Sequence, residues 1–374
     1  MKFVIKKDQI LPKVQFVNSI VPVRNPLQIL TNILFIVDAE TNSIKLVSTD
    51  LEVSGVSEMS GEVEESGTIA VPAREITEII RSLPEADIHF FTENNILRIK
   101  CLHIDYKLIF ANPEDFPEIP ERNWDNSFEI DSALFSRMIL KTSFAVSREI
   151  GRPAFTGVLW ELENETQRMV ATDGRRLGKV ETALSLDIAE RKIIIPIKGL
   201  NLIKSIIEEK KPILKIIPEE SGISFKYDSY KIFSRLIESK YPDYNAVIPY
   251  NNSKNVEVDR EALINAVKRV ALLATEDNYK IIFNFSKNHI VIHCEDIEKG
   301  AAKEVIETTA QIENFTIGFN YKYMLEILQL ISSSKVLIKL ENELDPALFF
   351  DTEHSEKITE KTLLLLMPLR IATD

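Results

Sequence analysis

The feature that most constrains the fold is an internal repeat with a period of about 124 residues. The stretch TIAVPAREITEIIRSL at 68–83 recurs as IIIPIKGLNLIKSIIE at 193–208 and as TIGFNYKYMLEILQLI at 316–331. Each copy reads as a strand followed by a helix, and the helical apolar positions coincide, as at Ile76, Leu200 and Met324. Because self-similarity of this kind reports a repeated structural unit, the chain is expected to build three similar modules.

Three further anchors recur in the same order. They are an aspartate before a second helix, an acidic turn, and a proline near the end of the module. In chain order the anchors are Asp8, Asp131 and Asp259; Asp50, Asp173 and Asp296; and Pro117, Pro242 and Pro368. The first aspartate of each module suits a helix N-cap, and the second suits a turn closed by its own side chain.

Three modules of this length fill the 374 residues, with borders in the polar stretches ERNWDNS and YNNSKN. We therefore expect modules at 1–125, 126–250 and 251–374. The segments between the helices, such as NHIVIHCED and VLIKLE, alternate apolar and polar residues as antiparallel strands do. The predicted fold class is α+β, with two helices packed on antiparallel sheets in each module.

Composition limits the compartment and the partners. The longest apolar run, LLLLMPL at 363–369, is too short to span a bilayer, and Lys6, Lys7 and Asp8 interrupt the N-terminus where a signal peptide is apolar. Two distant cysteines, Cys101 and Cys294, suit the reducing cytoplasm. A formal net charge of −12 argues against nucleic acid unless the basic residues are gathered on one face.

Enzymatic and metal chemistry find little support. His289, His293 and Cys294 lie in an alternating, strand-like segment that separates the two imidazoles, and Cys101 with His103 has the same weakness. No histidine accompanies a nucleophile in a recognisable turn, and there is no glycine-rich phosphate loop. We expect no catalytic residue, no metal and no cofactor.

Predicted helix faces carry basic residues in more than one module. Arg137 and Lys141 are i, i+4 neighbours, and Arg74 and Lys198 lie near the starts of two other helices. If the fold brings such faces to one side, an acidic protein presents a basic lining. Any grip on nucleic acid would then use phosphates and ignore base sequence.

At this point the whole chain resembles the bacterial sliding clamp family, the beta subunits of the replicative DNA polymerase. The resemblance rests on MKFVIKKDQIL, VPAREITEIIRSLP, ATDGRRLG, YPDYNAVIP and the ending LLLLMPLR. It implies the DNA-clamp fold, a head-to-tail homodimer closed around double-stranded DNA, and a non-enzymatic role in tethering the polymerase. Other implied partners are the clamp loader, repair and translesion polymerases, mismatch-repair proteins and ligase, which dock through short peptide motifs.

The resemblance also assigns residues to three surfaces. The peptide-binding pocket is implied at Phe155, Thr172, Gly174, Arg175, Arg176, Leu177, Pro242, Val247, Leu365, Leu366, Met367, Pro368, Leu369 and Arg370, with Leu177, Val247, Leu366 and Met367 as its apolar floor. For DNA it implies Arg24, Arg74 and Lys198, to which the charge argument adds Arg137, Lys141, Arg148 and Arg152. Ring closure is implied at Tyr106 and Leu108 in DYKLIF and at Leu272 and Leu273 in RVALLATE, as paired edge strands.

Two departures from the family pattern bear on the choice of partner. Arg175 stands where the family commonly has histidine, and Ala246 where it commonly has arginine. Two other classes of function remain open from sequence. One is a nucleic-acid enzyme that uses Asp173 and Arg176, and the other is a repeat scaffold that binds proteins alone.

Overall fold

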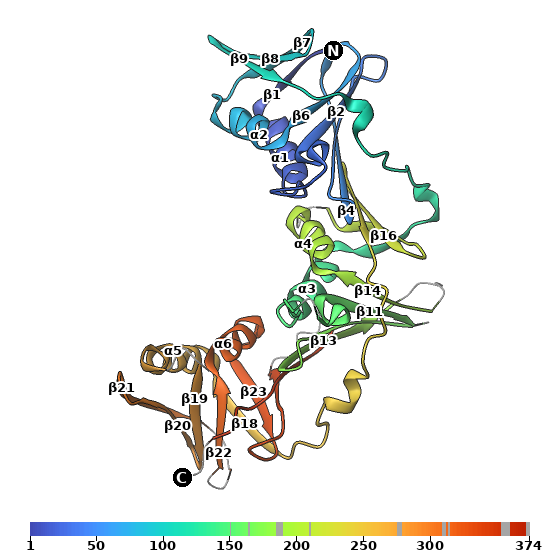
Figure 1. Cartoon of the computed structure of the whole chain (residues 1–374). Helices are drawn as coiled ribbons and strands as arrows, with labels where there is room; N and C mark the ends of the chain where they lie inside the picture. The colour runs from blue at the N-terminus through green and yellow to red at the C-terminus, as the bar shows by residue number, and fades with distance from the viewer. Residues whose placement is uncertain are drawn as a thin grey trace. The chain divides into compact units, whose positions relative to one another are not determined.

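The computed structural model describes residues 1–149, 151–163, 165–184, 190–208, 211–274, 279–308, 312, 315–352 and 360–371 (Figure 1). Contacts divide the chain into two compact units. The first unit comprises Met1–Ser136 and Lys198–Leu236, and the second comprises Arg137–Ile197 and Ile237–Asp374. Each unit therefore takes part of the predicted central module, because that module contributes strands to both.

The first unit contains two antiparallel sheets among its described residues. The five-stranded sheet has the order β5 (Glu62–Glu65), β1 (Lys2–Lys6), β7 (Asp87–Glu93), β8 (Ile96–Cys101), β9 (Ile104–Ile109). The eight-stranded sheet has the order β10 (Phe128–Asp131), β15 (Ile213–Pro218), β16 (Gly222–Tyr227), β17 (Tyr230–Arg235), β4 (Val53–Ser60), β3 (Ser43–Thr49), β2 (Asn32–Asp38), β6 (Gly67–Pro72). Helices α1 (Lys7–Asn18) and α2 (Ala73–Ser82) lie side by side, and α1 packs on β3 and β4 (Figure 1).

The second unit repeats this plan. Its eight-stranded sheet has the order β14 (Arg191–Pro196), β11 (Gly157–Glu163), β12 (Thr166–Thr172), β13 (Arg176–Ala183), β25 (Lys361–Leu366), β24 (Ala347–Asp351), β23 (Lys335–Leu340), β18 (Lys254–Asp259). Its four-stranded sheet has the order β21 (Gly300–Glu307), β20 (His289–Asp296), β19 (Lys280–Ser286), β22 (Phe315–Asn320). Helices α5 (Arg260–Val270) and α6 (Tyr321–Leu330) pack together and against these strands.

The remaining helices belong to the central module. They are α3 (Ser132–Ser143) and α4 (Ile197–Ile206). The second helices of the three modules begin at Ala73, Ile197 and Tyr321, a spacing of 124 positions each time. The helix pairs and antiparallel strands predicted from the repeat are confirmed.

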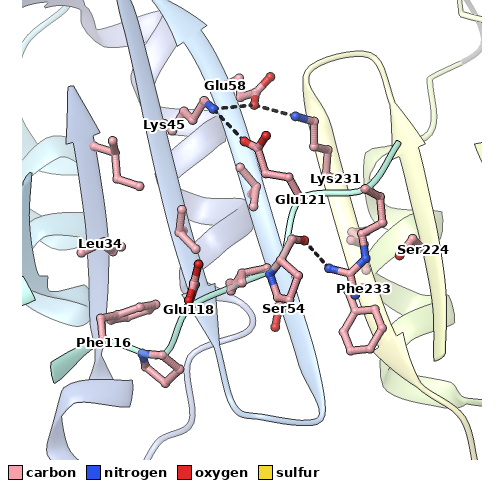
Figure 2. A pocket seen from close by; sticks show the side chains of 18 of the residues that line it. Leu34, Lys45, Ser54, Glu58, Phe116, Glu118, Glu121, Ser224, Lys231 and Phe233 are labelled. Carbon is pink, nitrogen blue, oxygen red and sulfur yellow. Dashed lines mark hydrogen bonds and ion pairs between the residues drawn. The ribbon is translucent and has the colours of Figure 1, made fainter. Parts of the chain in front are cut away.

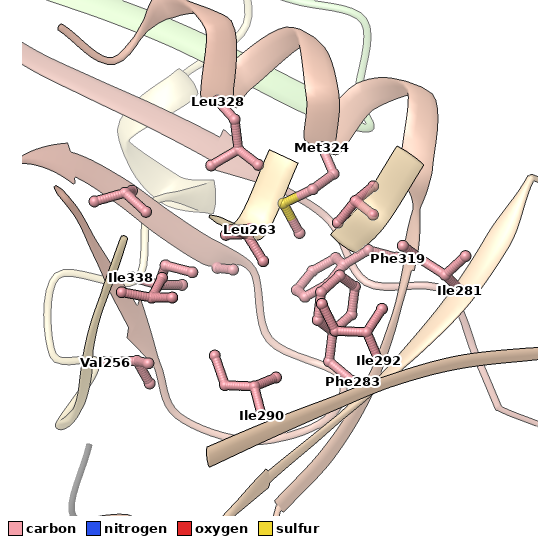
Figure 3. Packing of buried hydrophobic residues seen from close by; sticks show 14 of the residues in the cluster. Val256, Leu263, Ile281, Phe283, Ile290, Ile292, Phe319, Met324, Leu328 and Ile338 are labelled. Atoms are coloured by element: carbon pink, nitrogen blue, oxygen red, sulfur yellow. The ribbon is translucent and has the colours of Figure 1, made fainter. Parts of the chain in front are cut away.

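Apolar side chains at the repeat positions form the cores. In the C-terminal part, Met324 and Leu328 of α6 and Leu263 of α5 point onto strand residues that include Phe283 and Ile292 (Figure 3). All five are essentially inaccessible to solvent. Burial of each such side chain contributes about 1.5–3 kcal/mol, so these helices are fixed mainly by packing on the sheets.

The predicted helix caps are confirmed in two modules and wrong in one. The Asp131 carboxylate accepts a hydrogen bond from the Leu134 amide at 2.6 Å, and Asp259 accepts one from the Ala262 amide at 2.7 Å. Asp8 is not a cap, because α1 begins one residue before it and Lys6 occupies the N-cap position. Asp8 instead places its negative charge in the first helical turn, where the charge interacts favourably with the helix dipole.

Equivalent glycines let helices approach the sheets. A Cβ atom at Gly178 in β13 would lie 2.4 Å from the Lys141 carbonyl oxygen, and one at Gly55 in β4 would lie 2.1 Å from the Ile20 Cδ1 atom. Neither distance is compatible with van der Waals contact. The two glycines are 123 positions apart, so close helix–strand packing is part of the repeated design.

Candidate functional site

A cavity of about 500 Å³ lies in the second unit, where the β12–β13 turn, the end of β25 and the linker between β17 and β18 meet. We call residues 237–253 the second linker. Nine residues predicted for a pocket line this cavity: Phe155, Thr172, Gly174, Arg176, Leu177, Pro242, Val247, Leu365 and Met367. Segments far apart in the sequence thus form one site with several apolar walls.

The β12–β13 turn is held by its own aspartate. Asp173 Oδ1 accepts hydrogen bonds from the Arg175 and Arg176 amides at 2.9 and 3.0 Å, and Gly174 has φ = 85°. The equivalent aspartates, Asp50 and Asp296, each accept two backbone amides in the same way. The prediction of a repeated, structural acidic turn is confirmed.

Arg176 is fixed from several sides. Its Nε atom donates to Asp173 Oδ2 at 3.0 Å, its guanidinium lies 4.2 Å from the centre of the Tyr323 ring, and it also pairs with Glu326. Thr172 Oγ1 donates to the Arg176 carbonyl at 2.7 Å. The Arg176 side chain is therefore held in one position at the cavity wall, and its positive charge is balanced by the two carboxylates.

A charge network around the buried carboxylate of Glu161 anchors the second linker at Tyr244, which lines the cavity. The Tyr244 hydroxyl donates to Glu161 Oε2 at 2.6 Å, while Lys192 and Arg168 bind the same carboxylate at 2.7 and 3.0 Å. Arg168 also donates to Glu181 at 2.8 Å. Although burial disfavours its charge, these hydrogen bonds hold the pKa of the Glu161 carboxyl below its usual range. Burial and the neighbouring carboxylate raise the pKa of the Tyr244 hydroxyl, which stays a donor.

The floor of the cavity differs from the prediction, which placed Leu177, Val247, Leu366 and Met367 there. Leu177 and Leu365, cross-strand partners on β13 and β25, line it, and Met367 and Val247 form its more exposed edge. Leu366 does not line the cavity, because alternate residues of a strand face opposite sides, and its side chain is buried in the C-terminal core.

Four other predicted pocket residues do not line the cavity. Arg175, Pro368, Leu369 and Arg370 are absent from the cavity wall, although the Arg175 carbonyl accepts the Met367 amide at 2.8 Å and so joins the turn to the C-terminal segment. Sequence reasoning missed eight lining residues: Asp243, Tyr244, Ala246, Ile248, Pro249, Leu344, Asp345 and Pro346. Five of them belong to the stretch YPDYNAVIP, whose resemblance to the family could have identified them. The other three lie in the loop before β24, where no sequence motif pointed to a pocket.

The predicted ring-closing segments lie at sheet margins. β9, with Tyr106 and Leu108, is an edge strand that pairs only with β8 among the described strands. Leu272 and Leu273 are not in a strand, because RVALLA forms the end of α5 and a 3-10 turn (Ala271–Leu273). The edge strand beside them is β21, which sequence reasoning missed.

The predicted DNA-facing residues fall into two groups. Arg24, Arg74, Arg148 and Arg152 are exposed and form no ion pair within the described part of the chain. Lys198 pairs with Asp50, and Arg137 donates to Glu360 at 3.2 Å. Lys141 is buried, with its ammonium 3.0 Å from Glu360 and 3.7 Å from Asp351, so it fills a structural role that the helix pattern did not reveal.

The residues weighed as metal ligands are strand and turn residues. His289, His293 and Cys294 lie in β20, where His293 contacts Asn284 at 3.2 Å. Across the described ranges, no group of three histidine, cysteine or acidic side chains is arranged to hold a metal ion. Nor does any helix in those ranges have the length and apolar character needed to cross a membrane.

Comparison with known families decides the assignment. Residues 1–120, 129–243 and 245–366 match, in order, the N-terminal, central and C-terminal domains of the DNA polymerase III beta subunit. The chain belongs to the DNA polymerase III beta subunit family. The fold prediction of three tandem clamp-type modules is thereby confirmed.

Individual relatives agree with this family. The beta sliding clamp of Chlamydia trachomatis is 30% identical over 379 residues, covering 100% of this chain and 88% of the relative. A crystal structure of the Pseudomonas aeruginosa sliding clamp bound to griselimycin has 30% identity and a TM-score of 0.90, covering 99% of this chain and all of that one. The Bacillus subtilis clamp structure has 26% identity and a TM-score of 0.92, with full coverage of both chains.

The protein is accordingly a sliding clamp, a processivity factor of DNA polymerase III that performs no catalytic step. The family implies a homodimer that works with DNA and polymerase. The alternative of a nucleic-acid enzyme is wrong, and the Asp173 oxygens that it required are engaged in the turn.

Proposed function

We propose that two copies of the chain join head to tail and close a ring around double-stranded DNA, tethering the replicative polymerase catalytic subunit. The observation that carries this proposal is the series of three family domains, which together cover residues 1–366 apart from two short gaps. The available edges of β9 and β21 support it, since unpaired strand edges favour pairing with another chain. Tyr106, Leu108, Leu272 and Leu273 are the proposed contacts.

The second-unit cavity is proposed as the docking pocket for partner tails. Its floor of Leu177 and Leu365 suits one or two bulky apolar side chains, each contributing about 1.5–3 kcal/mol when buried. Ordering a flexible tail offsets much of that gain, so single tails bind at about micromolar strength and exchange readily. The proposed users are the polymerase, the clamp loader, repair and translesion polymerases, mismatch-repair proteins and ligase.

The proposed DNA contacts are the exposed arginines, Arg24, Arg74, Arg148 and Arg152. Lys198 and Arg137 join them only if phosphate competes with Asp50 and Glu360, and buried Lys141 is left out. Contacts to phosphates carry no base specificity and weaken steeply with salt.

We place this activity in the cytoplasm. Cys101 and Cys294 support that placement, because both are buried free thiols, and burial raises the pKa of each and keeps it unreactive.

Primer extension on a long single-stranded circular template tests the function. With the cognate polymerase and clamp loader, adding the protein is expected to lengthen the products made in a single binding event. Leu272→Asp, which alters an exposed residue of the proposed ring contact, should abolish this gain without affecting the polymerase alone. Products of unchanged length with the wild-type protein would reject the proposal.

A further inference from the structure

A second cavity, of about 570 Å³, lies in the first unit and has no role in the function proposed above. It forms between the eight-stranded sheet of that unit and residues 110–127, which join β9 to β10 and which we call the first linker (Figure 2). Residues of β2, β3, β4, β16 and β17 make one wall, and residues 113–114 and 116–122 with Trp124 make the other. All of these residues belong to the same compact unit.

The two cavities have the same architectural setting. The strand orders β6-β2-β3-β4-β17-β16-β15-β10 and β14-β11-β12-β13-β25-β24-β23-β18 match position by position, and a linker lies against each sheet. In the second unit the cross-strand pair Leu177–Leu365 lines the cavity. The equivalent cross-strand pair in the first unit, Ser54–Phe233, also lines its cavity.

The first linker shows which chemistry this sheet face accepts. Between two 3-10 turns (Pro113–Asp115 and Trp124–Asn126) it has neither helix nor strand; there Phe116 is extended and only 8% exposed, and Ile119 is half-buried. The cavity beside it continues the same surface with the half-buried side chains of Leu34, Ile36 and Val56. This uncovered part of the surface is therefore suited to a second extended segment with bulky apolar side chains, bound in the way that the chain's own linker is.

The charges around the cavity favour a cationic ligand. Lys45 and Lys231 both contact Glu58, at 3.8 and 2.7 Å, and Lys45 also contacts Glu121 at 3.3 Å (Figure 2). Arg122 is likewise paired, with Glu219 at 3.0 Å. The lining cations are thus neutralised by the protein itself.

The carboxylates of Glu114 and Glu118, unlike the lining cations, have no oppositely charged partner among the described residues. Both are exposed on the first linker, both line the cavity, and neither forms an ion pair in the described part of the chain. Their uncompensated charge makes the linker side of the cavity acidic.

We propose that this cavity binds a short extended segment of a partner protein, with bulky apolar side chains flanked by lysine or arginine. The apolar side chains occupy the wall of Leu34, Ile36 and Val56, and the basic residues lie against Glu114 and Glu118. The lining residues of this site are separate from those of the second-unit pocket.

The test uses the full chain and a synthetic hexapeptide, acetyl-Lys-Leu-Phe-Gly-Leu-Lys-amide, titrated by calorimetry. Leu34→Arg places a long cation in the cavity from a half-buried position, and we expect it to weaken binding more than tenfold. Glu114→Lys with Glu118→Lys removes the acidic rim at exposed positions, and we expect binding about 3- to 10-fold weaker, as for two exposed ion pairs.

Three matched controls accompany these variants. Glu40→Lys with Glu62→Lys makes the same charge change at exposed positions elsewhere in the first unit and should leave affinity unchanged. Val247→Arg obstructs the second-unit cavity, which also accepts bulky apolar side chains, and should leave affinity at the first-unit cavity unchanged. The peptide with glutamate in place of both lysines should bind about 3- to 10-fold more weakly than the cationic peptide.

Several outcomes would overturn the proposal. These are no binding at millimolar peptide, equal affinity for the cationic and acidic peptides, or loss of binding in Val247→Arg alone. A sedimentation change in Leu34→Arg would also overturn it, because a second copy of the chain would then occupy this face. The proposed clamp function is tested separately by primer extension and survives each of these results.

Discussion

The end of β25 and the residue after it allow a direct test of the second-unit pocket. Met367 is half-buried at the cavity edge, whereas Leu366 next to it is fully buried in the C-terminal core. Met367→Ala removes contact with a bound peptide and leaves the core intact. We expect a loss of about 1–2 kcal/mol in peptide binding, which is about 5- to 30-fold in affinity, and a change in unfolding free energy below about 1 kcal/mol.

Leu366→Ala should show the opposite pattern. Truncating a fully buried leucine costs about 2–5 kcal/mol of stability, which lowers the melting temperature of a unit of this size by about 4–20 °C. Peptide affinity measured well below that melting temperature should stay within about twofold of wild type. The combined Met367→Ala/Leu366→Ala variant mixes the two effects and is less informative.

Fluorescence anisotropy with a labelled peptide from a polymerase tail measures the affinity, and calorimetric unfolding measures the stability. Val247→Ala is a matched variant on the same exposed edge of the cavity and should weaken binding of the peptide, as Met367→Ala does. The reasoning is refuted if Leu366→Ala weakens the peptide strongly at unchanged stability. It is also refuted if Met367→Ala leaves affinity at the wild-type value.

Three further predictions concern the framework. Gly178→Ala should lower the unfolding free energy by about 1–3 kcal/mol, because its methyl group meets the Lys141 carbonyl; chemical denaturation showing no loss would contradict the packing. Leu272→Asp should yield monomers with an unchanged melting profile, and sedimentation of intact dimers would count against this prediction. Leu272 is a cleaner position for the test than Leu273, because Leu272 is 78% exposed whereas Leu273 packs on the C-terminal core. The pKa of Glu161 is lower in the folded state than in the unfolded state, so its carboxylate stabilises the fold above the usual carboxyl pKa, and this stabilisation is lost as the pH falls through the folded-state pKa. Glu161→Gln should therefore be less stable than wild type at neutral pH, and its stability should depend less on pH in the acid range.

The repeat predicted the parts of the fold that local sequence encodes. Helix starts at Asp131 and Asp259 were found because a cap and an apolar period occur together. The start at Asp8 was misplaced because α1 begins one residue earlier, with no side-chain cap. The two eight-stranded sheets that join strands from neighbouring modules were not found, since strand pairing over long sequence separations leaves no local period.

Site details failed for related reasons. The run LLLLMPL is apolar at every position, so it contains no alternation to show that Leu365 faces the cavity and Leu366 the core. Lys141 looked like a surface cation because its partner Glu360 lies more than 200 residues away in the sequence. The β12–β13 turn was found because its aspartate recurs in all three modules.

Retention on DNA of defined topology tests the central claim most directly. Protein loaded by the cognate clamp loader onto nicked circular DNA is passed over a sizing column in salt high enough to break phosphate contacts, and the bound fraction is measured before and after one restriction cut. A closed ring predicts that the protein stays on the circle and leaves once the DNA is linear. Loss from the intact circle at that salt, or retention on the linear product with free ends, would contradict the account.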